Sequence, residues 1–384
     1  MTTRDSRTEA QGYSDQVQDP HRSLHSETGA LPGEHPGRSG NPLVKVAGLA
    51  WVEFEKPDLD QAERFATDFG FAVADRTPET LLLRGRWASS ACLVIRRGPQ
   101  PRFAGAVFQA AARDDLDRLA RGTGGTVMAH WGGHAVRLRD PSGFPVHVVY
   151  GVPELPALPG RAPLPLNFGA EPVRANATQR PARHPAEIQR LGHVVLGTTR
   201  FRAALDWYLD TLGLIVSDFL YLDGHRDRGP AMAFIRCDLG SVPADHHTLA
   251  MLLQPRTEYV HSAYQLTDLD EVAASGEYLR ERGYRHAWGL GRHIQGSQIF
   301  DYWRDPDRLM FEHYADGDVF DSLAEPGWAP LSRSGLAQWG PRATAEFTGT
   351  SDPRVVVAAI KALRDKGNEI DMPALRGLIK AMSS

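Results

Sequence analysis

The stretch LGHVVLGTTRFRAALDWYLDTLGL at residues 191–214 predicts a short strand, a turn and a helix that stops at Gly213. Apolar residues recur at helical spacing from Phe201 to Leu212, and a glycine just after the last helical residue is a common stop signal. The stretch GLAWVEFEKPDLDQAERFATDFGF at residues 48–71 repeats this pattern almost residue for residue. The chain therefore carries a duplicated unit.

A second pair of segments supports the duplication. RDPSGFPVHVVY at residues 139–150 and RDPDRLMFEHY at residues 304–314 each place a turn of the Asp-Pro type before a strand. A weaker repetition within each half predicts four helices in the whole chain. Each helix is preceded by one strand and followed by three. The predicted helices are Leu59 to Phe69, Asp114 to Gly122, Phe201 to Leu212 and Leu269 to Arg282. Four βαβββ modules, paired into two domains, predict an α+β protein with curved mixed sheets.

Composition divides the 384 residues further. Residues 1–42 lack hydrophobic periodicity and are predicted to form a disordered tail. A Pro-, Ala- and Arg-rich stretch at 153–187 predicts a linker between the two domains, which then occupy 43–152 and 188–320. The remaining segment, 321–384, is expected to end in a pair of amphipathic helices that pack on a partner subunit or on the domain itself.

The composition also argues against several classes of protein. The net charge is −4 with both signs interspersed, so no basic face indicates a nucleic-acid partner. The longest apolar runs are too short to cross a bilayer, and the first residues do not resemble a signal peptide. Cys92 and Cys237 are too few for a disulfide framework or a thiolate metal cluster. We therefore expect a cytoplasmic protein that binds neither nucleic acid nor a membrane.

Three residues have the chemistry of a metal site, namely His193, His261 and Glu312, each in a segment predicted to be a strand. Two imidazoles and one carboxylate hold non-haem Fe(II) on one face and leave the opposite positions open for substrate and O₂. A single histidine in a strand is more often a hydrogen-bonded structural residue. Residue types alone therefore do not establish the site.

The repeat provides a comparison within the chain. Where the C-terminal copy has the three ligands, the N-terminal copy has Ala50, a position near Ala104, and His147. Both copies keep the apolar pattern. Polar residues needed for folding should tend to recur in both copies, so their restriction to one copy favours chemistry. The sequence thus predicts a metal site in the C-terminal half.

The module count, the Arg-Asp-Pro turn before the last strand and the three ligand residues resemble the two-domain type I extradiol ring-cleaving dioxygenases of the vicinal oxygen chelate superfamily. The similarity covers about residues 43 to 320 and is strongest from Leu191 to Asp318. In that family the equivalent strands line one concave sheet, so the resemblance implies the glyoxalase/dioxygenase fold and ligands that meet. It also implies a small catecholic substrate, O₂ and a homo-oligomer.

Iron is the metal that we expect. The helical His-Glu-x-x-His arrangement of zinc hydrolases is absent from the sequence. Mn(II) accepts the same ligands as Fe(II), so the choice between these two metals stays open. Cleavage that places both oxygen atoms in the product needs no external reductant, in agreement with the absence of a Rossmann glycine fingerprint and of an Fe–S cysteine cluster.

The resemblance assigns three further residues around the metal. His247 corresponds to the family's acid-base histidine, although its interval to His261 is one residue shorter than expected, and His246 could take the role instead. His293 and Tyr302 match the family's substrate-binding histidine and tyrosine by their spacing. A histidine can accept a catechol proton near neutral pH, and a tyrosine can stabilise negative charge on a substrate oxygen. Tyr302 could also be a cross-strand packing residue, and His293 a surface-loop residue.

We therefore predict an Fe(II)-dependent extradiol dioxygenase that cleaves a catechol or a more hydroxylated aromatic ring beside its vicinal hydroxyls and incorporates both atoms of O₂. Two other functions suit the same scaffold. One is an isomerase or lyase with a redox-inert metal, against which His247, His293 and Tyr302 argue. The other is a protein that binds an aromatic ligand, which has no need of two histidines and a glutamate.

Overall fold

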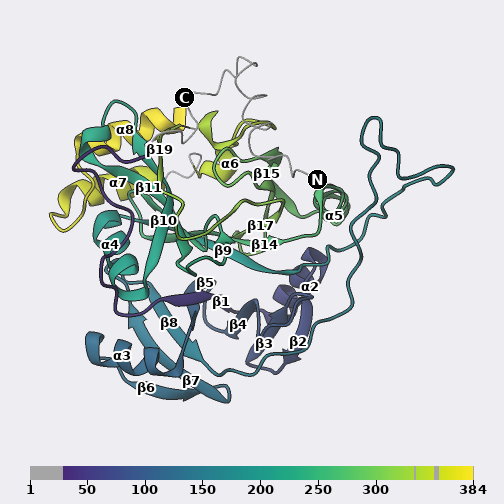
Figure 1. Cartoon of the computed structure of the whole chain (residues 1–384), viewed down its shortest axis with the longest axis horizontal. Coiled ribbons are helices and arrows are strands. Elements are labelled where there is room, and N and C mark those ends of the chain that lie inside the picture. Colours follow the sequence, from purple (N-terminus) through teal and green to yellow (C-terminus); the bar gives the residue numbers. More distant parts are fainter. Residues whose placement is uncertain (1–28, 333, 350–353, 384) are drawn as a thin grey trace, which may run out of the picture.

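The computed structural model describes residues 29–332, 334–349 and 354–383. An eight-stranded sheet forms the N-terminal half and lies below the nine-stranded sheet of the C-terminal half in Figure 1. A small third sheet pairs β12 (Ala244–Asp245) with β18 (Val319–Phe320). The two large sheets are the scaffolds of the two halves of the duplication.

Each large sheet contains two modules made of one strand, one helix and three further strands. The N-terminal modules are β1 (Val46–Lys56), α2 (Leu59–Phe69), β2 (Ala72–Arg76), β3 (Thr80–Arg84) and β4 (Leu93–Arg97), then β5 (Arg102–Ala110), α3 (Arg113–Thr123), β6 (Val127–His130), β7 (Gly133–Arg139) and β8 (Pro145–Tyr150). The C-terminal modules are β9 (Arg190–Thr198), α4 (Phe201–Leu212), β10 (Leu214–Leu222), β11 (Pro230–Cys237) and β13 (Leu249–Leu253), then β14 (Glu258–Gln265), α5 (Leu269–Glu281), β15 (Arg285–Arg292), β16 (Ile299–Arg304) and β17 (Met310–Ala315). The predicted α+β fold of four βαβββ modules is confirmed, and the four predicted helices begin and end within one residue of the observed ones.

The two modules of each sheet meet through their first strands. In the N-terminal sheet β1 pairs antiparallel with β5, and each of them pairs parallel with the last strand of its own module. The C-terminal sheet repeats this order around β9 and β14, and it adds β19 (Gly327–Leu331) beside β10. Because β9, β14 and β17 are neighbours at the centre of this sheet, side chains on one of its faces come together there.

The helix ends explain why this local structure could be predicted. Asp58 caps α2 by accepting a hydrogen bond from the backbone N–H of Gln61, and α2 stops at Gly70 in the left-handed conformation. Gly213 ends α4 in the same way, with φ of 65°. A Cβ at Gly213 would lie 2.3 Å from the carbonyl oxygen of Val44, so both backbone conformation and close approach require glycine there.

An aromatic core joins the two halves. Phe54 of β1 packs edge-on against Tyr259 of β14, with ring centroids 5.0 Å apart. His313 of β17 stacks on Phe69 of α2 at 3.8 Å and donates a hydrogen bond from Nε2 to its carbonyl oxygen at 2.8 Å. Burial lowers the pKa of His313 to about 4, so the ring is neutral. His313 therefore serves the interface, on the opposite face of the strand from Glu312, as strand alternation predicts.

A buried ion pair also joins the halves. Lys56, at the end of β1, pairs with Asp305 in the turn before β17, and its Nζ lies 2.9 Å from Oδ2 of Asp307. The Lys56 and Asp305 side chains are 1% and 0% exposed. Burial raises the pKa of Asp305, although the charge of Lys56 opposes this effect. Removing Lys56 would leave a carboxylate buried without its cation.

We expect Lys56→Met to lower the free energy of unfolding by about 3–5 kcal/mol, the usual effect of removing one partner of a buried pair. Lys45→Met is the matched control, since Lys45 also links the halves, through Asp238, but its side chain is 54% exposed. An exposed pair contributes only about 0–1 kcal/mol. Urea denaturation of both variants and the parent measures the difference. Equal losses in the two variants would show that burial does not determine the effect.

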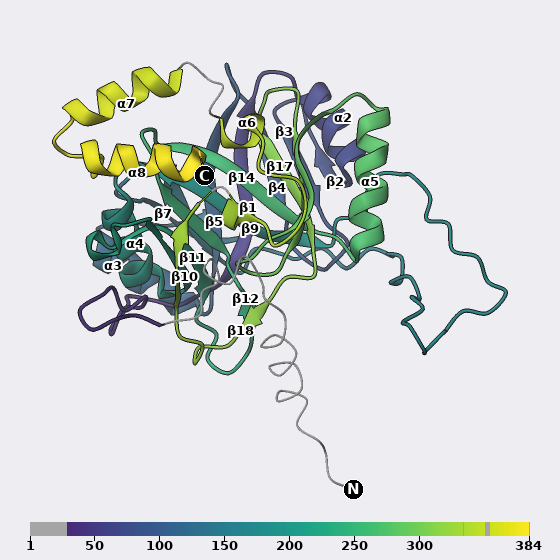
Figure 2. The ribbon, with the colours of Figure 1, turned by 90° about the horizontal axis from the view of Figure 1, so that it is seen from above.

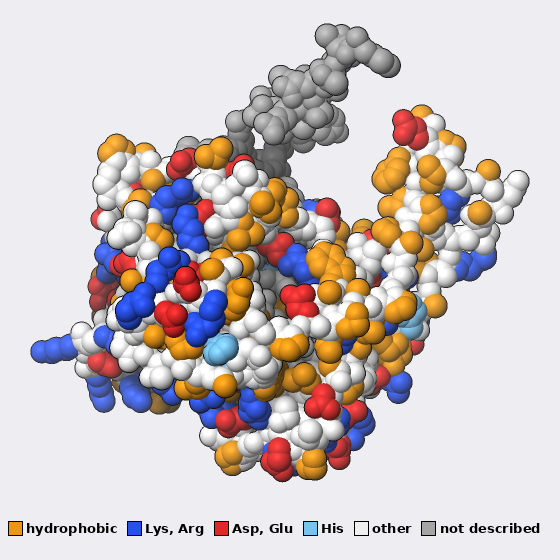
Figure 3. Space-filling model, turned by 60° about the horizontal axis from the view of Figure 1, so that its bottom comes forward, with side chains coloured by type: hydrophobic (Ala, Val, Ile, Leu, Met, Phe, Trp, Pro, Cys, Tyr) orange, Lys and Arg blue, Asp and Glu red, His pale blue; other side chains and the backbone are white. Residues whose placement is uncertain are grey.

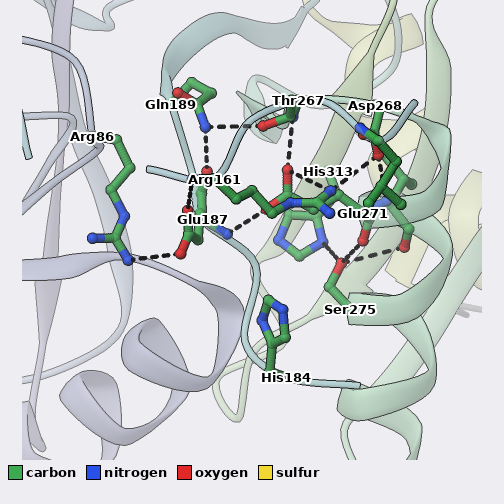
Figure 4. A network of polar contacts seen from close by, with 12 residues as sticks. Arg86, Arg161, His184, Glu187, Gln189, Thr267, Asp268, Glu271, Ser275 and His313 are labelled. Atoms are coloured by element: carbon green, nitrogen blue, oxygen red, sulfur yellow. Dashed lines mark hydrogen bonds and ion pairs between the residues drawn. The ribbon is translucent and has the colours of Figure 1, made fainter. Parts of the chain in front are cut away.

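The connection from β8 to β9 contacts the rest of the protein near both of its ends, and its middle projects away. At the β9 end the backbone N–H of Glu187 donates to Oε1 of Glu271 at 2.7 Å, and nearer the β8 end Arg161 pairs with Oε2 of the same glutamate at 3.3 Å (Figure 4). The middle of the connection projects away from the rest of the protein as an arm (Figure 1, right), on which apolar side chains are visible at the surface (Figure 3). Phe168, in this stretch, is 66% exposed. We propose that this segment is the predicted linker, 153–187, with the predicted domain boundaries on either side.

The N-terminal segment differs from its prediction. Residues 1–28 of the predicted tail lie outside the described residues. Residues 29–42 were also expected to be disordered, but they lie along the C-terminal half. Val216 donates its backbone N–H to the carbonyl oxygen of Gly37 at 2.7 Å, and Arg226 pairs with Glu34 at 2.7 Å. These are polar contacts with distant residues, which hydrophobic periodicity does not reveal.

The C-terminal extension contains α6 (Ala345–Thr348), α7 (Arg354–Arg364) and α8 (Met372–Ser383). The expected helical pair corresponds to α7 and α8, which lie side by side at the edge of the C-terminal half (Figure 2). Gly377 of α8 packs closely on Leu222 of β10, where a Cβ would lie 2.9 Å from a Leu222 side-chain atom. In the described part of the chain, no helix combines the length and apolar character needed to cross a membrane.

Candidate metal centre

The structure brings His193, His261 and Glu312 to one point. They lie on the neighbouring strands β9, β14 and β17, and all three side chains are buried. One ligand atom from each lies within 4.8 Å of the others. Oε2 of Glu312 is 3.2 Å from Nε2 of His193 and 3.1 Å from Nε2 of His261. Residues far apart in the sequence thus present two imidazoles and one carboxylate to the same small volume.

Several polar atoms of these three side chains lack the partners that buried polar atoms need. Both carboxylate oxygens of Glu312, both ring nitrogens of His261 and Nδ1 of His193 have no hydrogen-bond partner among the described residues. A buried polar atom without a partner costs about 1–3 kcal/mol, and a charged one costs more. Neighbouring ligands of an octahedral ion with bonds of about 2.1 Å lie about 3 Å apart, close to the observed spacings. The residues therefore fit a divalent cation.

The charge states also suit a metal. Burial alone would raise the pKa of Glu312, but His193, His261 and His293 outweigh it and hold this pKa well below its usual value. Burial lowers the pKa of His261. The centre therefore combines one carboxylate with a neutral imidazole, which is the form of histidine that binds metals.

His247 lies against this cluster. Its ring centroid is 3.9 Å from that of His193, and its side chain is buried. Burial, and after it the charges of His193 and His246, hold the pKa of His247 well below its usual value. His246, the alternative for the acid-base role, directs Nε2 to Oδ2 of Asp218 at 2.7 Å. Of the two adjacent histidines, His247 is the one whose ring packs on a predicted metal ligand.

His293 and Tyr302 form a hydrogen-bonded pair beside the carboxylate. Nδ1 of His293 lies 2.7 Å from the carbonyl oxygen of Leu336, which only accepts, so Nδ1 carries the proton. In the neutral ring Nε2 then accepts from the hydroxyl of Tyr302 at 2.9 Å. Nε2 of His293 is also 3.8 Å from Oε1 of Glu312. Glu312 and Tyr302 are opposite each other on the paired strands β17 and β16. Burial raises the pKa of Tyr302 well above its usual value, and the charge of Glu312 adds to this effect.

Apolar rings surround this pair. Trp288 of β15 stacks parallel to Tyr302 at 5.6 Å, and Phe347 of α6 packs on Tyr302 at 4.8 Å. The chain before α6 runs along the edge of β15, where Arg292 donates its backbone N–H to the carbonyl oxygen of Trp339 at 2.9 Å. The sequence did not reveal the contacts of this segment, because they join residues that are far apart in the chain.

A cavity of about 600 Å³ lies beside the centre. His293 and His246 line it, together with Asp218 and Arg292. Asp218 was not predicted to have a role. The available signal was a carboxylate inside the apolar stretch LIVSDFLYL at residues 214–222, but its partner could not be inferred from local sequence.

The N-terminal sheet has a different interior at the equivalent place. Trp51, beside Ala50 on β1, is fully buried and stacks on Trp131 with ring centroids 5.0 Å apart. Val107 and Val149 belong to the same apolar cluster. Among the described residues, three metal-binding side chains converge at the C-terminal triad, and no such group lies in the N-terminal sheet. In the described part of the chain, the converging triad is thus confined to one copy of the duplicated unit.

Known proteins resemble this chain in both sequence and fold. Residues 190–313 match the sequence profile of the Glyoxalase/Bleomycin resistance protein/Dioxygenase superfamily. The chain is 30% identical over 341 residues to metapyrocatechase 2 of Cupriavidus necator, and the match covers 87% of this chain and 99% of the relative. The chain belongs to the extradiol ring-cleaving dioxygenases. The family that the sequence resembles is confirmed.

Two further dioxygenases resemble the chain at lower identity. The manganese-dependent 2,3-dihydroxybiphenyl 1,2-dioxygenase of Geobacillus genomosp. 3 is 24% identical over 323 residues, which cover 78% of this chain and 95% of that protein. The crystal structure of homoprotocatechuate 2,3-dioxygenase from Arthrobacter globiformis superposes with a TM-score of 0.65 at 20% identity, covering 81% and 93% of the two chains. The second likeness supports the fold.

Proposed function

We propose that this extradiol dioxygenase uses Fe(II), held by His193, His261 and Glu312, to cleave a catechol or a more hydroxylated aromatic ring. The ring opens beside its vicinal hydroxyls, and both atoms of O₂ enter the product. The observation that carries the proposal is the convergence of the three side chains, with both oxygens of Glu312 and both ring nitrogens of His261 unpaired among the described residues. This ligand set is the one that non-haem Fe(II) oxygenases use.

The bound metal would supply a shared binding point for the deprotonated catechol and O₂. The residues around it divide the remaining work. His247, neutral and packed on His193, can take the proton of a catechol hydroxyl. Tyr302 and His293 form a hydrogen-bonded pair that can bind a substrate oxygen. Trp288 and Phe347 provide apolar surface that excludes water from the ring.

Iron is proposed because non-haem Fe(II) oxygenases use this ligand set, but Mn(II) accepts the same residues and one relative is named as manganese-dependent. The test is therefore made with both metals. The protein is stripped of metal, loaded anaerobically with Fe(II) or Mn(II), and given O₂ with catechol, 2,3-dihydroxybiphenyl or homoprotocatechuate. We expect a yellow ring-opened product and consumption of one O₂ per ring, with higher turnover in the Fe(II) protein.

The same experiment separates the other functions of this scaffold. Product without O₂ uptake would indicate an isomerase or lyase, and failure to retain either metal would indicate a binding protein. An absence of turnover with every diol despite bound metal would contradict the proposal. A higher rate with Mn(II) would overturn the choice of iron and leave ring cleavage standing.

We further propose that the protein works as a homo-oligomer. Val356 and Val357 of α7 are 64% and 68% exposed, and apolar side chains of this size favour burial against a partner. Light scattering on the purified protein tests this, and a monomer at micromolar concentration would contradict it.

A further inference from the structure

A chain of three buried side chains leads away from the metal centre. Nε2 of His246 lies 2.7 Å from Oδ2 of Asp218, and Nδ1 of His246 lies 2.9 Å from Nδ1 of His247. The exposed fractions of Asp218, His246 and His247 are 7%, 1% and 3%. The chain therefore runs from a carboxylate, through one imidazole, to the ring that packs on His193.

The chemistry of the acceptors fixes where the protons sit. An ionised carboxylate only accepts, so His246 carries its proton on Nε2 and donates it to Asp218. In the neutral ring Nδ1 of His246 is then an acceptor, and Nδ1 of His247 must be the donor. His247 is left with Nε2 unprotonated, at the opposite edge of its ring from His246. This is the tautomer that a general base needs.

The middle residue of this chain is held in place by its surroundings. Ser217 donates its hydroxyl to the carbonyl oxygen of His246 at 2.6 Å, and the backbone N–H of His246 donates to the carbonyl oxygen of Asp318 at 2.9 Å. Gly296 passes so close that a Cβ there would lie 2.8 Å from Nδ1 of His246. The φ of Gly296 is +79°, a conformation that also favours glycine. The imidazole of His246 therefore has little freedom to turn away from either partner.

We propose that Asp218 and His246 are positioning residues, which hold His247 with Nε2 free to remove the proton of a catechol hydroxyl. In this step the substrate O–H bond breaks and an N–H bond forms on His247. The resulting positive charge is shared through the hydrogen bond with His246 and stabilised by the negative charge of Asp218. This inference rests on the proposed ring cleavage, since it assigns the base of that reaction its tautomer.

Asp218→Asn is the decisive variant. An amide at this position can donate its N–H to Nε2 of His246, which reverses the direction of both hydrogen bonds and leaves the proton of His247 on Nε2. Turnover of catechol should then fall about 10–100-fold, because the base is in the wrong tautomer. A nitrocatechol is already ionised near neutral pH and needs no base for its first proton. With this substrate the same variant should lose less than about threefold, on the same scale of general-base effects.

The controls separate positioning from damage to the protein. Each rate is divided by that of the parent on the same substrate, and metal content is measured in every preparation. Asp318→Asn is the matched control, because Asp318 meets this network through its backbone carbonyl, and it should keep the parent's ratio of the two rates. If the parent is inactive on both substrates, the proposed function fails. If the parent is active and Asp218→Asn loses equally on both substrates, or on neither, the positioning role is overturned.

A second pair of variants tests the same role at His246. The side-chain oxygen of asparagine can accept from Nδ1 of His247, whereas leucine cannot accept. His246→Asn should therefore retain at least several-fold more activity on catechol than His246→Leu, and the two should be similar on the nitrocatechol. Equal activity of the two variants on catechol would overturn the proposal even if Asp218→Asn does not fold.

Discussion

Glu312→Gln is expected to leave a folded protein that no longer binds its metal, with ring cleavage lost. The substitution removes the one anionic ligand and keeps the shape of the side chain. Loss of an outer partner of a metal ligand already costs about 10–100-fold in affinity, so loss of the carboxylate itself should exceed this range. Metal content by mass spectrometry and O₂ uptake with catechol measure the two losses.

The same variant has a second signature in the metal-free protein. Glu312 is fully buried, but the neighbouring histidines hold its pKa well below its usual value, so the folded metal-free protein favours the charged form of this residue. The metal-free variant should therefore melt below the metal-free parent. Added Fe(II) or Mn(II) should raise the melting temperature of the parent, because the metal binds the native state, and should leave that of the variant unchanged.

Glu271→Gln is the matched control for this experiment. Glu271 is also a buried glutamate of the C-terminal half, but it accepts backbone N–H groups of Glu187 and Thr267 and lies away from the three ligands. This control should keep its metal and lose stability. If Glu312→Gln retained the metal affinity and turnover of the parent, Glu312 would not be a ligand.

The contrast between these two glutamates shows what the sequence could reveal. The helix from Phe201 to Leu212 and its stop at Gly213 were predictable, because apolar spacing and glycine conformation act over a few residues. Whether a buried glutamate is placed to bind a metal, as Glu312 is, or accepts backbone hydrogen bonds, as Glu271 does, depends on segments that come together from distant parts of the chain. Only the duplication offered a clue, by placing His147 where the other copy has Glu312.

The orientation of side chains also could not be predicted from the sequence. His246 and His247 are adjacent and of the same residue type, so spacing alone left both as candidates for the acid-base role. Their environments differ because one ring faces Asp218 and the other faces His193. The order of residues 29–42 could not be predicted for a related reason, since contacts such as that of Glu34 with Arg226 depend on tertiary structure and not on composition.

His247→Asn is expected to lower turnover of catechol by about 10²–10⁴-fold, the usual range for loss of a general acid or base. The metal should remain, because His247 is not one of the three residues whose ligand atoms converge. His286→Asn is the control, since His286 is hydrogen-bonded to Asp301, and it should keep the turnover of the parent. Parent-like turnover in His247→Asn would exclude an acid-base role, and loss of the metal would place His247 among the ligands.

The loss of turnover in His247→Asn also sets an upper limit for any residue that acts only through His247. If Asp218 acts only through His247, Asp218→Asn cannot cost more than His247→Asn. The double variant should be no slower than His247→Asn alone, because residues that act as a unit are not additive. Independent contributions would instead multiply the two losses. Catechol turnover of the two single variants and the double variant, each loaded with the same metal, therefore decides whether the carboxylate and the base form one catalytic unit.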